Sequence, residues 1–354
     1  MNGMNNIEIV RYERKYQSTL IDLLQHIWTG LTPEERKAKF EWRYLDNPYT
    51  TQPFIYLALE GEQMAGFRAF VVQVFKVDQK VIRIFSPADA IVHPNYRRLG
   101  IFSKLNNAMI NDINRLFPEQ AAILNLSSNT LSTPGYLKQN WQRANAQKAY
   151  AFRVSLINFI RVSIIKKRTY QLTPKILTRG NLTFEISGEI KSKELASFVN
   201  WSRNVRKITN IRDEGYFKWR YSAKSGTDYS YLYCYSDKQL VGYAICKKIS
   251  PYQYVLEEYL AADTAILKKV VSCLIRFYQI PVLRTLAISA DQKSLLRSLR
   301  FVVESKFLQK IFKVNRLPVL IRSTRIDPAD QDLLINNINM LDMNSWVIFQ
   351  ADVH

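Results

Sequence analysis

The chain has 354 residues, of which 47% are hydrophobic and 23% charged, and it carries a formal net charge of +20. A chain of this length and composition is globular and fits two domains better than one. It contains no run approaching the ~20 apolar residues that a membrane-spanning helix needs, no signal-peptide pattern at Met1–Asn6 and no Cys-x-x-Cys pair. We therefore expect a cytoplasmic protein, and the wide spacing of His26, His93 and His354 predicts no metal site.

The large positive charge admits three explanations. Basic side chains can simply form a solvated surface, they can bind nucleic acid such as tRNA, or they can contact an anionic membrane. All three stay open at this point.

The first 80 residues predict one strand, two helices and a strand hairpin. Ile7–Tyr12 is the strand, and an apolar stripe over 20–27 is typical of a helix. Thr32, followed by a proline and two glutamates, caps a second helix that continues through the segment Phe40–Tyr44. The strands of the hairpin are Phe54–Leu59 and Met64–Val77.

An anion-binding turn is predicted where a strand over Arg83–Val92 passes into a helix. Pro94 ends the strand because proline cannot donate to a sheet, and Gly100 permits a tight turn at the start of the helix. The apolar residues that follow recur at helical spacing. Free backbone N–H groups at a helix start, beside Arg97 and Arg98, make a physical site for an anion.

The sequence of this turn, from Val92 to Leu105, resembles the acyl-CoA-binding signature of the GNAT N-acetyltransferases, Arg/Gln-x-x-Gly-x-Gly/Ala. Arg97 matches the leading basic position and Gly100 the first glycine, whereas Phe102 stands where the family has Gly or Ala. The resemblance implies that backbone N–H groups of the turn hold the CoA pyrophosphate and that the strand before it pairs with the pantetheine arm. The implied contact residues are Ile91, Val92, Arg97, Arg98, Leu99, Gly100, Ile101, Phe102, Ser103 and Asn129.

A second segment, Tyr136–Trp141, follows a strand over 122–126 and resembles the family's Tyr-x-x-x-Gly-Phe. Asn140 stands at the glycine position, and asparagine tolerates the left-handed conformation of a helix cap. The resemblance implies that Tyr136 protonates the departing CoA thiolate; alternatively, it is a half-buried helix tyrosine. Asp89 is the first candidate for the base that deprotonates the attacking amine and Glu41 the second, although either could be a surface or ion-paired carboxylate.

Residues 155–182 interleave isoleucine, leucine and phenylalanine with basic side chains, after a closing strand over 148–154. This segment is either an amphipathic basic helix lying on an anionic membrane or an interdomain helix that packs its apolar side on a core. We expect the interdomain helix. The basic residues are Arg161, Lys166, Lys167, Arg168, Lys175 and Arg179.

The chain then repeats itself, because Phe217–Tyr221 (Phe-Lys-Trp-Arg-Tyr) restates Phe40–Tyr44 (Phe-Glu-Trp-Arg-Tyr) and similar strand segments follow both. Such a repeat predicts two copies of one domain. We interpret the repeated motif as structural, with Arg220 as a cation at its exposed end.

The second copy lacks the residues of the predicted site. Its matching stretch, Tyr254–Leu267, has no glycine and no arginine at the turn, and Asp263 there would repel a pyrophosphate. Leu296 stands in the place of Tyr136. The tail Trp346–Asp352 is expected to add a strand or to return acidic groups to the cleft between the copies.

These observations predict an α/β protein of two tandem GNAT-like domains, each a mixed sheet flanked by helices. The domains are 1–154, which binds acyl-CoA and is catalytic, and 183–354, which is degenerate, with 155–182 as linker. The resemblance implies a bacterial N-acetyltransferase that uses acetyl-CoA, without a metal, on a small-molecule amine, preferably an amino sugar of a surface polysaccharide. Two alternatives stay open: a transferase like the Fem family, which uses aminoacyl-tRNA, and a binding protein without activity.

Overall fold

The computed structural model describes residues 7–118, 121–165, 175–202, 206–314, 316–325 and 329–353. The first half of the chain forms β1 (Ile7–Arg11), α1 (Gln17–Leu24), α2 (Pro33–Phe40), β2 (Phe54–Glu60), β3 (Gln63–Val77), β4 (Lys80–Val92), α3 (Ile101–Leu116), β5 (Ala121–Asn125), α4 (Thr133–Leu137) and β6 (Gln142–Val154). A π-helical turn, Glu41–Leu45, extends α2.

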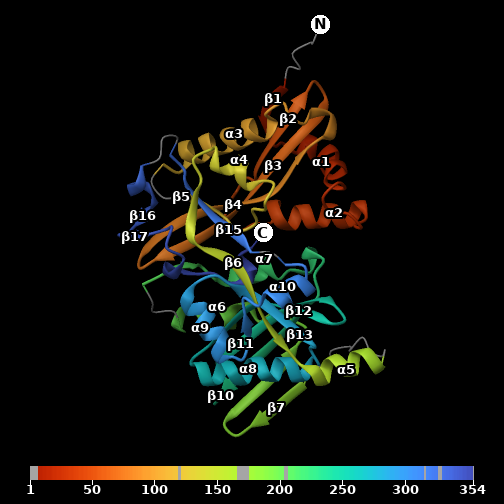
Figure 1. Ribbon diagram of the computed structural model, residues 1–354, viewed down its shortest axis with the longest axis vertical. Helices are drawn as coiled ribbons and strands as arrows, with labels where there is room; N and C mark the ends of the chain where they lie inside the picture. The colour runs from red at the N-terminus through yellow and green to blue at the C-terminus, as the bar shows by residue number, and fades with distance from the viewer. Residues whose placement is uncertain are drawn as a thin grey trace.

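The second half repeats this succession. Its elements are α5 (Leu156–Ile165), β7 (Lys175–Arg179), β8 (Leu182–Ser187), α6 (Ser192–Ser202), β9 (Ile208–Asn210), α7 (Glu214–Arg220), β10 (Tyr229–Ser236), β11 (Gln239–Ser250), β12 (Gln253–Ala261), α8 (Thr264–Phe277), β13 (Val282–Ala287), α9 (Ala290–Ser298), β14 (Val302–Val303), α10 (Lys306–Ile311), β15 (Leu317–Ser323), β16 (Leu334–Ile335), β17 (Ile338–Asn339) and β18 (Trp346–Val347). Figure 1 shows the first half at the top and most of the second half below it, with β15, β16 and β17 of the second half beside β4 and β5.

One sheet runs through both halves, in the order β1-β2-β3-β4-β5-β15-β6-β13-β12-β11-β10-β8-β7. The strands of the two halves follow one another in opposite order along this sheet. Each half supplies a strand that completes the sheet of the other. β15 from the second half pairs with β5 of the first, and the last six residues of β6 pair with β13 of the second. The halves therefore exchange a strand each.

Helices cover both faces of the sheet in the first half. On one face α1 and α2 pack Leu24 and Phe40 against Phe67 of β3. On the other face α3 packs Met109 and Ile113 against β5 and its neighbours. The predicted helix start at Thr32 is confirmed: its hydroxyl accepts from the N–H of Glu35, whose carboxylate accepts from the N–H of Thr32.

The repeated aromatic motif forms the junction between the halves. The rings of Trp42 and Trp219 stack with their centroids 6.2 Å apart, and each indole N–H donates to the backbone carbonyl of the other tryptophan, at 2.6 and 2.7 Å. The predicted exposed position of Arg220 is wrong. Arg220 is 5% exposed, and its guanidinium bonds to Glu257 at 3.2 Å, because the two halves close over this end of the motif.

The expected packing of the linker helix is also wrong. The apolar side chains of α5 point outward, with Leu156, Ile157 and Ile164 between 66% and 75% exposed. The spacing of apolar residues predicts a helix but not which side of it is buried. Here the buried side carries Asn158, which bonds to the carbonyls of Ile275 and Ile280. Lys166, Lys167 and Arg168 lie outside the described residues.

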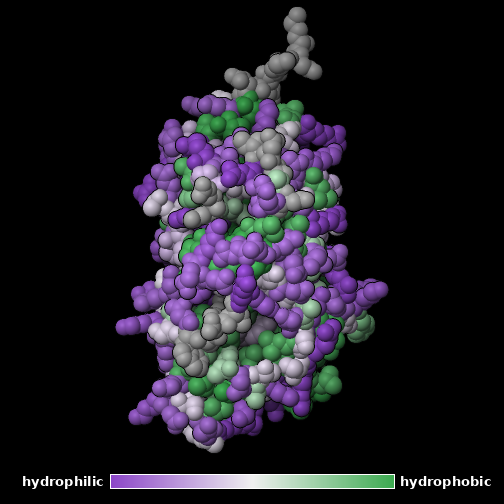
Figure 2. Space-filling model, turned by 90° about the vertical axis from the view of Figure 1, so that its left-hand side faces the viewer, coloured by the Kyte–Doolittle hydropathy of each residue, from purple (hydrophilic) through white to green (hydrophobic). Residues whose placement is uncertain are grey.

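The tail adds a strand, as expected, because β18 pairs with β9 in parallel. Its Asp352 does not line a described cavity but is buried, with its carboxylate 2.9 Å from the guanidinium of Arg212. The face of the molecule in Figure 2 is mostly hydrophilic, with hydrophobic side chains gathered near the top, at mid-height and toward the lower end. Among the described residues no helix is long and apolar enough to cross a bilayer.

Candidate functional site

Strands β4 and β5 diverge halfway along β4. Their parallel pairing covers only Arg83–Phe85 against Ala121–Ile123. Beyond it, β5 stays with β15, whereas β4 continues to Val92 with β3 alone. Ser127 donates its hydroxyl to the carbonyl of Pro87 at 3.0 Å, close to where the strands diverge. The far end of β4 thus presents an edge toward β5 that no described strand pairs with.

A bulge lies on this edge. In the β3–β4 register Arg68 faces Ala90 and Phe70 faces Pro87, so Ala88 and Asp89 together oppose one residue of β3. A bulge leaves a backbone group outside the ladder and bends the strand at that point. The bulge falls two strand residues before Ile91, which is buried, and Val92, which is half-buried.

The turn after β4 leaves a run of backbone N–H groups without described acceptors. Arg98 and Gly100 both have left-handed backbone conformations, with φ of +68° and +72°, and a side chain added at Gly100 would meet nothing within 4 Å. No described group accepts a hydrogen bond from the backbone N–H groups of residues 98–103, which lead directly into the 16-residue helix α3. Successive free N–H groups and the positive end of a helix dipole attract phosphate oxygens. Arg97, Arg98, Leu99, Gly100 and Ser103 are exposed here, and Ile101 is buried beneath them.

Phe102 turns inward from this turn. Its ring lies 5.6 Å from the ring of Tyr136, between centroids, so the substitution for Gly or Ala places no side chain over the turn. Tyr136 itself is 3% exposed and packs its ring 4.8 Å from Trp141. The left-handed φ of +61° at Asn140 confirms the expected cap.

Arg68 completes this group, and sequence reasoning missed it. It is 2% exposed, its Nη2 donates to the hydroxyl of Tyr136, and its Nε donates to Asn106 Oδ1 at 3.1 Å. Its guanidinium also lies over the rings of Phe70 and Phe102, at 5.0 and 5.6 Å. No carboxylate forms an ion pair with it among the described residues. Burying a cation without an anionic partner lowers the stability of the fold. A side chain kept in such a position is therefore a candidate for a functional role.

The two halves differ at Arg68. Gly66 and Gly242 occupy matching positions, because each lies too close to the facing strand for a side chain. A Cβ added at Gly66 would lie 2.7 Å from the carbonyl oxygen of Ile91, and one added at Gly242 would lie 2.9 Å from the Cβ of Ala261. Counting two residues on from each glycine pairs Arg68 with Ala244. The arginine is therefore absent from the half that lacks the turn, and this comparison of the repeats was the signal that could have found it.

Both carboxylate oxygens of Asp89 accept hydrogen bonds from neighbouring side chains. Its carboxylate accepts from Arg43 at 2.8 Å, from the hydroxyl of Tyr44 and from the indole of Trp28 at 3.3 Å. Burial, and after it the charge of Asp89, raises the pKa of Tyr44 well above its ordinary value, so Tyr44 stays a donor.

The same arrangement recurs in the second half, where Tyr221 donates to Glu258 at 2.9 Å and Arg220 to its neighbour Glu257. Since a half without the turn keeps these contacts, they belong to the architecture of the repeat.

The two remaining predicted residues make no described hydrogen bond to Tyr136 or Arg68. Glu41 accepts one hydrogen bond, from Gln17 at 3.1 Å, through Oε1. Asn129 starts the loop before α4, and its Oδ1 accepts from the N–H groups of Leu131 and Ser132 at 2.9 and 2.8 Å, which orients its amide group.

The matching turn in the second half is closed by its own side chain. Asp263 caps α8, and its carboxylate accepts from the N–H of Ile266 at 2.7 Å. A cavity of about 430 Å³ adjoins this turn, and the tail lines it with Trp346 and Phe349. The negative charge of Asp263 and the capped N–H make the turn unsuited to phosphate.

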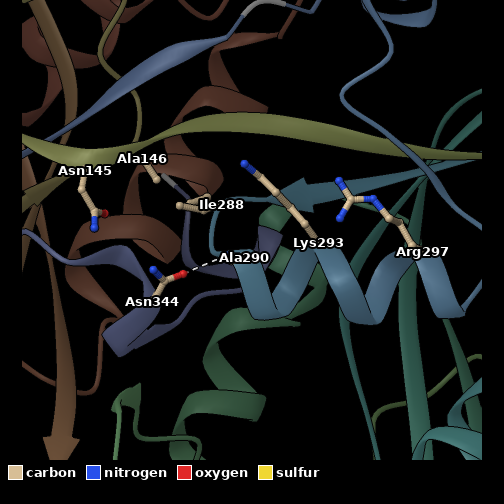
Figure 3. Close-up of a pocket in the computed structure, with 7 residues that line it drawn as sticks. All are labelled: Asn145, Ala146, Ile288, Ala290, Lys293, Arg297 and Asn344. Carbon is tan, nitrogen blue, oxygen red and sulfur yellow. Dashed lines mark hydrogen bonds between the residues drawn. The ribbon is translucent and has the colours of Figure 1, made fainter.

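A further cavity, of about 340 Å³, lies between the halves (Figure 3). Lys293 and Arg297 of α9 extend over it toward β6, and Asn344 fixes one end of α9 by accepting from the N–H of Ala290 at 2.9 Å. None of the predicted site residues lines it. Among the described residues, no group of acidic, histidine or cysteine side chains has the arrangement of a metal site.

No protein-family model and no curated protein matches this chain. Solved structures do. A probable N-acyltransferase from Enterococcus faecalis V583 superimposes with a TM-score of 0.64 at 13% identity, over 90% of this chain and 74% of that one. A GCN5-related N-acetyltransferase from Anabaena variabilis gives a TM-score of 0.60 at 10% identity, over 91% and 74%.

A tandem GNAT protein from the clavulanic acid biosynthesis pathway gives a TM-score of 0.56 at 12% identity, over 92% of this chain and all of that one. The chain therefore has the α/β fold of the GNAT superfamily. More specifically, it has the tandem GNAT fold, as the repeat predicted.

Proposed function

We propose that this protein is an acyl-CoA-dependent N-acyltransferase, with acetyl-CoA as the donor, and that the donor binds to the first half alone. One observation carries the proposal: the turn with free N–H groups, the buried Arg68 and Tyr136 occur together in the first half. In the second half Asp263, Ala244 and Leu296 stand in their places.

The donor fits what the first half offers. The N–H groups of residues 98–103 suit the oxygens of a pyrophosphate, and Arg97 and Arg98 add positive charge beside them. The unpaired edge of β4 at Ile91 and Val92 suits an extended pantetheine chain, whose amides can bond as a strand does. When bound, the donor supplies a thioester carbonyl as the electrophile.

Tyr136 is the proposed acid. Because its oxygen accepts from Arg68, its own proton is free to pass to the sulfur as the thiolate leaves. The phenolate that results lies beside a guanidinium, which stabilises the negative charge in surroundings of low polarity. Arg68 thus acts as a positioning residue for the proton transfer.

Glu41 is the proposed base. Its Oε2 has no hydrogen-bond partner among the described residues, whereas both oxygens of Asp89 are occupied. Glu41 can take the proton of the amine directly or through a water molecule. Asp89 in turn holds Arg43 and Tyr44 in place beside the bulge of β4.

The proposed acceptor is the amino group of a small molecule. The likeness to a tandem GNAT protein of the clavulanic acid biosynthesis pathway supports a small-molecule acceptor, and the family resemblance favours an amino sugar of a surface polysaccharide. The donor is a cytoplasmic metabolite, so we place the reaction there.

The proposal is tested with radiolabelled acetyl-CoA. We expect saturable binding that tRNA does not displace, and release of free CoA thiol when a panel of amines and amino sugars is added. All cysteines of the chain are buried, so a thiol reagent reports CoA with little background. Displacement of acetyl-CoA by aminoacyl-tRNA would instead indicate a transferase like the Fem family. Binding without thiol release from any amine would indicate a binding protein.

A further inference from the structure

Helix α5 has its polar and apolar sides reversed. Its side chain turned toward the protein is Asn158, 5% exposed, whose amide donates to the carbonyls of Ile275 and Ile280 at 3.2 and 3.1 Å. The side chains turned to solvent are large and apolar: Leu156 73%, Ile157 66%, Phe159 43%, Ile160 55% and Ile164 75% exposed. A soluble helix normally has the opposite arrangement.

The patch extends beyond the helix. The ring of Phe159 lies 5.3 Å from that of Tyr252, in the turn between β11 and β12, and Ile249 beside that turn is 49% exposed. These elements are at the end of the molecule opposite β1 and β2, with α5 at the lower right of Figure 1. Exposed apolar side chains gathered in this way mark a surface that binds something.

The charge around the patch indicates what that is. From residue 121 to residue 184 the chain has no aspartate or glutamate. Arg161 lies on α5 itself, and the basic sequence Lys166-Lys167-Arg168, outside the described residues, follows the helix. An apolar surface inside a purely basic segment is complementary to an interface that is apolar within and anionic at its rim. A bilayer of anionic lipids has this composition.

We propose that α5 docks the protein onto an anionic membrane surface, lying parallel to it. A helix of 10 residues is about 15 Å long, far short of the ~30 Å hydrocarbon core, so it can enter one leaflet but not cross. Its isoleucines enter the boundary between head groups and acyl chains, and Arg161 contacts the head groups. The docking surface is separate from the proposed catalytic half and does not depend on the proposed function.

The test is co-sedimentation of the full chain with vesicles. We expect binding to vesicles of phosphatidylcholine with 30% phosphatidylglycerol, at least tenfold weaker binding to pure phosphatidylcholine, and weakening by salt. The triple variant Ile157→Ser/Ile160→Ser/Ile164→Ser should bind the anionic vesicles at least tenfold more weakly than the wild type. Because these side chains are exposed, its melting temperature should stay within a few degrees.

The matched control is Phe307→Ser, which removes a side chain 71% exposed on α10 and should leave vesicle binding unchanged. Three results would overturn the proposal. The wild type could fail to bind anionic vesicles, or the triple variant could bind them as well as the wild type, which would assign the attraction to net charge alone. Sedimentation velocity could also show a dimer that only the triple variant loses, which would make the occupant a second copy of the chain.

Discussion

Arg68 and Asp89 show why residue type alone does not identify a functional side chain. Asp89 has the right chemistry for a base, yet its contacts with Arg43 and Tyr44 have counterparts in the half without the turn. Arg68 sits in an apolar strand, where the sequence gives no pattern to follow, and it contacts Tyr136 only through the fold. The resemblance found Tyr136 and the turn; burial and the comparison of the repeats were needed to find Arg68.

The first prediction concerns Arg68→Met. Turnover should fall at least tenfold while the affinity for CoA stays within a few-fold, because the turn that holds the pyrophosphate is untouched. Removing a buried cation that has no anionic partner should stabilise the fold, whereas Tyr136 and Asn106 lose a hydrogen-bond donor, which should destabilise it. Because the two effects oppose each other, the free energy of unfolding should change by less than about 2 kcal/mol.

Steady-state kinetics, calorimetry and chemical unfolding measure these three quantities. Arg68→Lys should recover part of the turnover. A large loss of stability with kcat unchanged would make Arg68 a structural residue.

The second prediction concerns Tyr136→Phe. The ring keeps its packing against Phe102 and Trp141, so CoA affinity should be nearly unchanged, whereas turnover should fall by roughly ten- to ten-thousand-fold, the range for a lost proton donor. Stopped-flow detection of thiol release checks this. Turnover equal to that of the wild type would make Tyr136 a packing residue.

The third prediction separates the two carboxylates. Glu41→Gln should lower kcat/KM with stability preserved, because Gln keeps the contact with Gln17. Asp89→Asn should instead lower the free energy of unfolding by on the order of 2 kcal/mol, since Arg43 loses its partly buried partner. The reverse pattern, with activity lost specifically in Asp89→Asn and stability intact, would return the role of base to Asp89.

At the scale of the element, local signals predicted most of the strands and helices of the first half and their caps. Thr32 caps the helix expected of it, and Gly100 starts α3. What local signals could not give is the partner of an element. The strand exchange of β6 and β15 and the outward face of α5 both depend on contacts between segments far apart in sequence, which apolar spacing does not encode.

The fourth prediction follows from the exchange. Residues 1–154 alone should be insoluble or molten, because β5 loses β15, which pairs along residues 122–125, and the last part of β6 loses β13. Co-expression of 1–154 with 155–354 as two chains should restore a soluble complex that binds CoA. A folded 1–154 fragment that transfers acetyl groups at the full rate would contradict the account.

At the scale of the whole molecule, two copies of one fold face each other across the stacked Trp42 and Trp219. The repeat keeps the residues that build this junction and differs at those proposed to do chemistry. We interpret the second half as a structural partner of the first, which completes its sheet and supplies one side of the cavity between the halves. Its own turn, capped by Asp263, is proposed to bind no CoA.

The central claim is that one CoA binds per chain, at the turn of the first half. Isothermal titration of the full chain with CoA tests it most directly, in the wild type and in Gly100→Glu, which places a side chain and a negative charge against the pyrophosphate. Gly61→Glu is the matched control, because Gly61 also has a left-handed φ, +57°, and open space around it but lies in the β2–β3 hairpin. Thr264→Glu makes the same charge change at the turn of the second half. The account predicts one site in the wild type and both controls and none in Gly100→Glu; two sites per chain, or undiminished binding by Gly100→Glu, would contradict it.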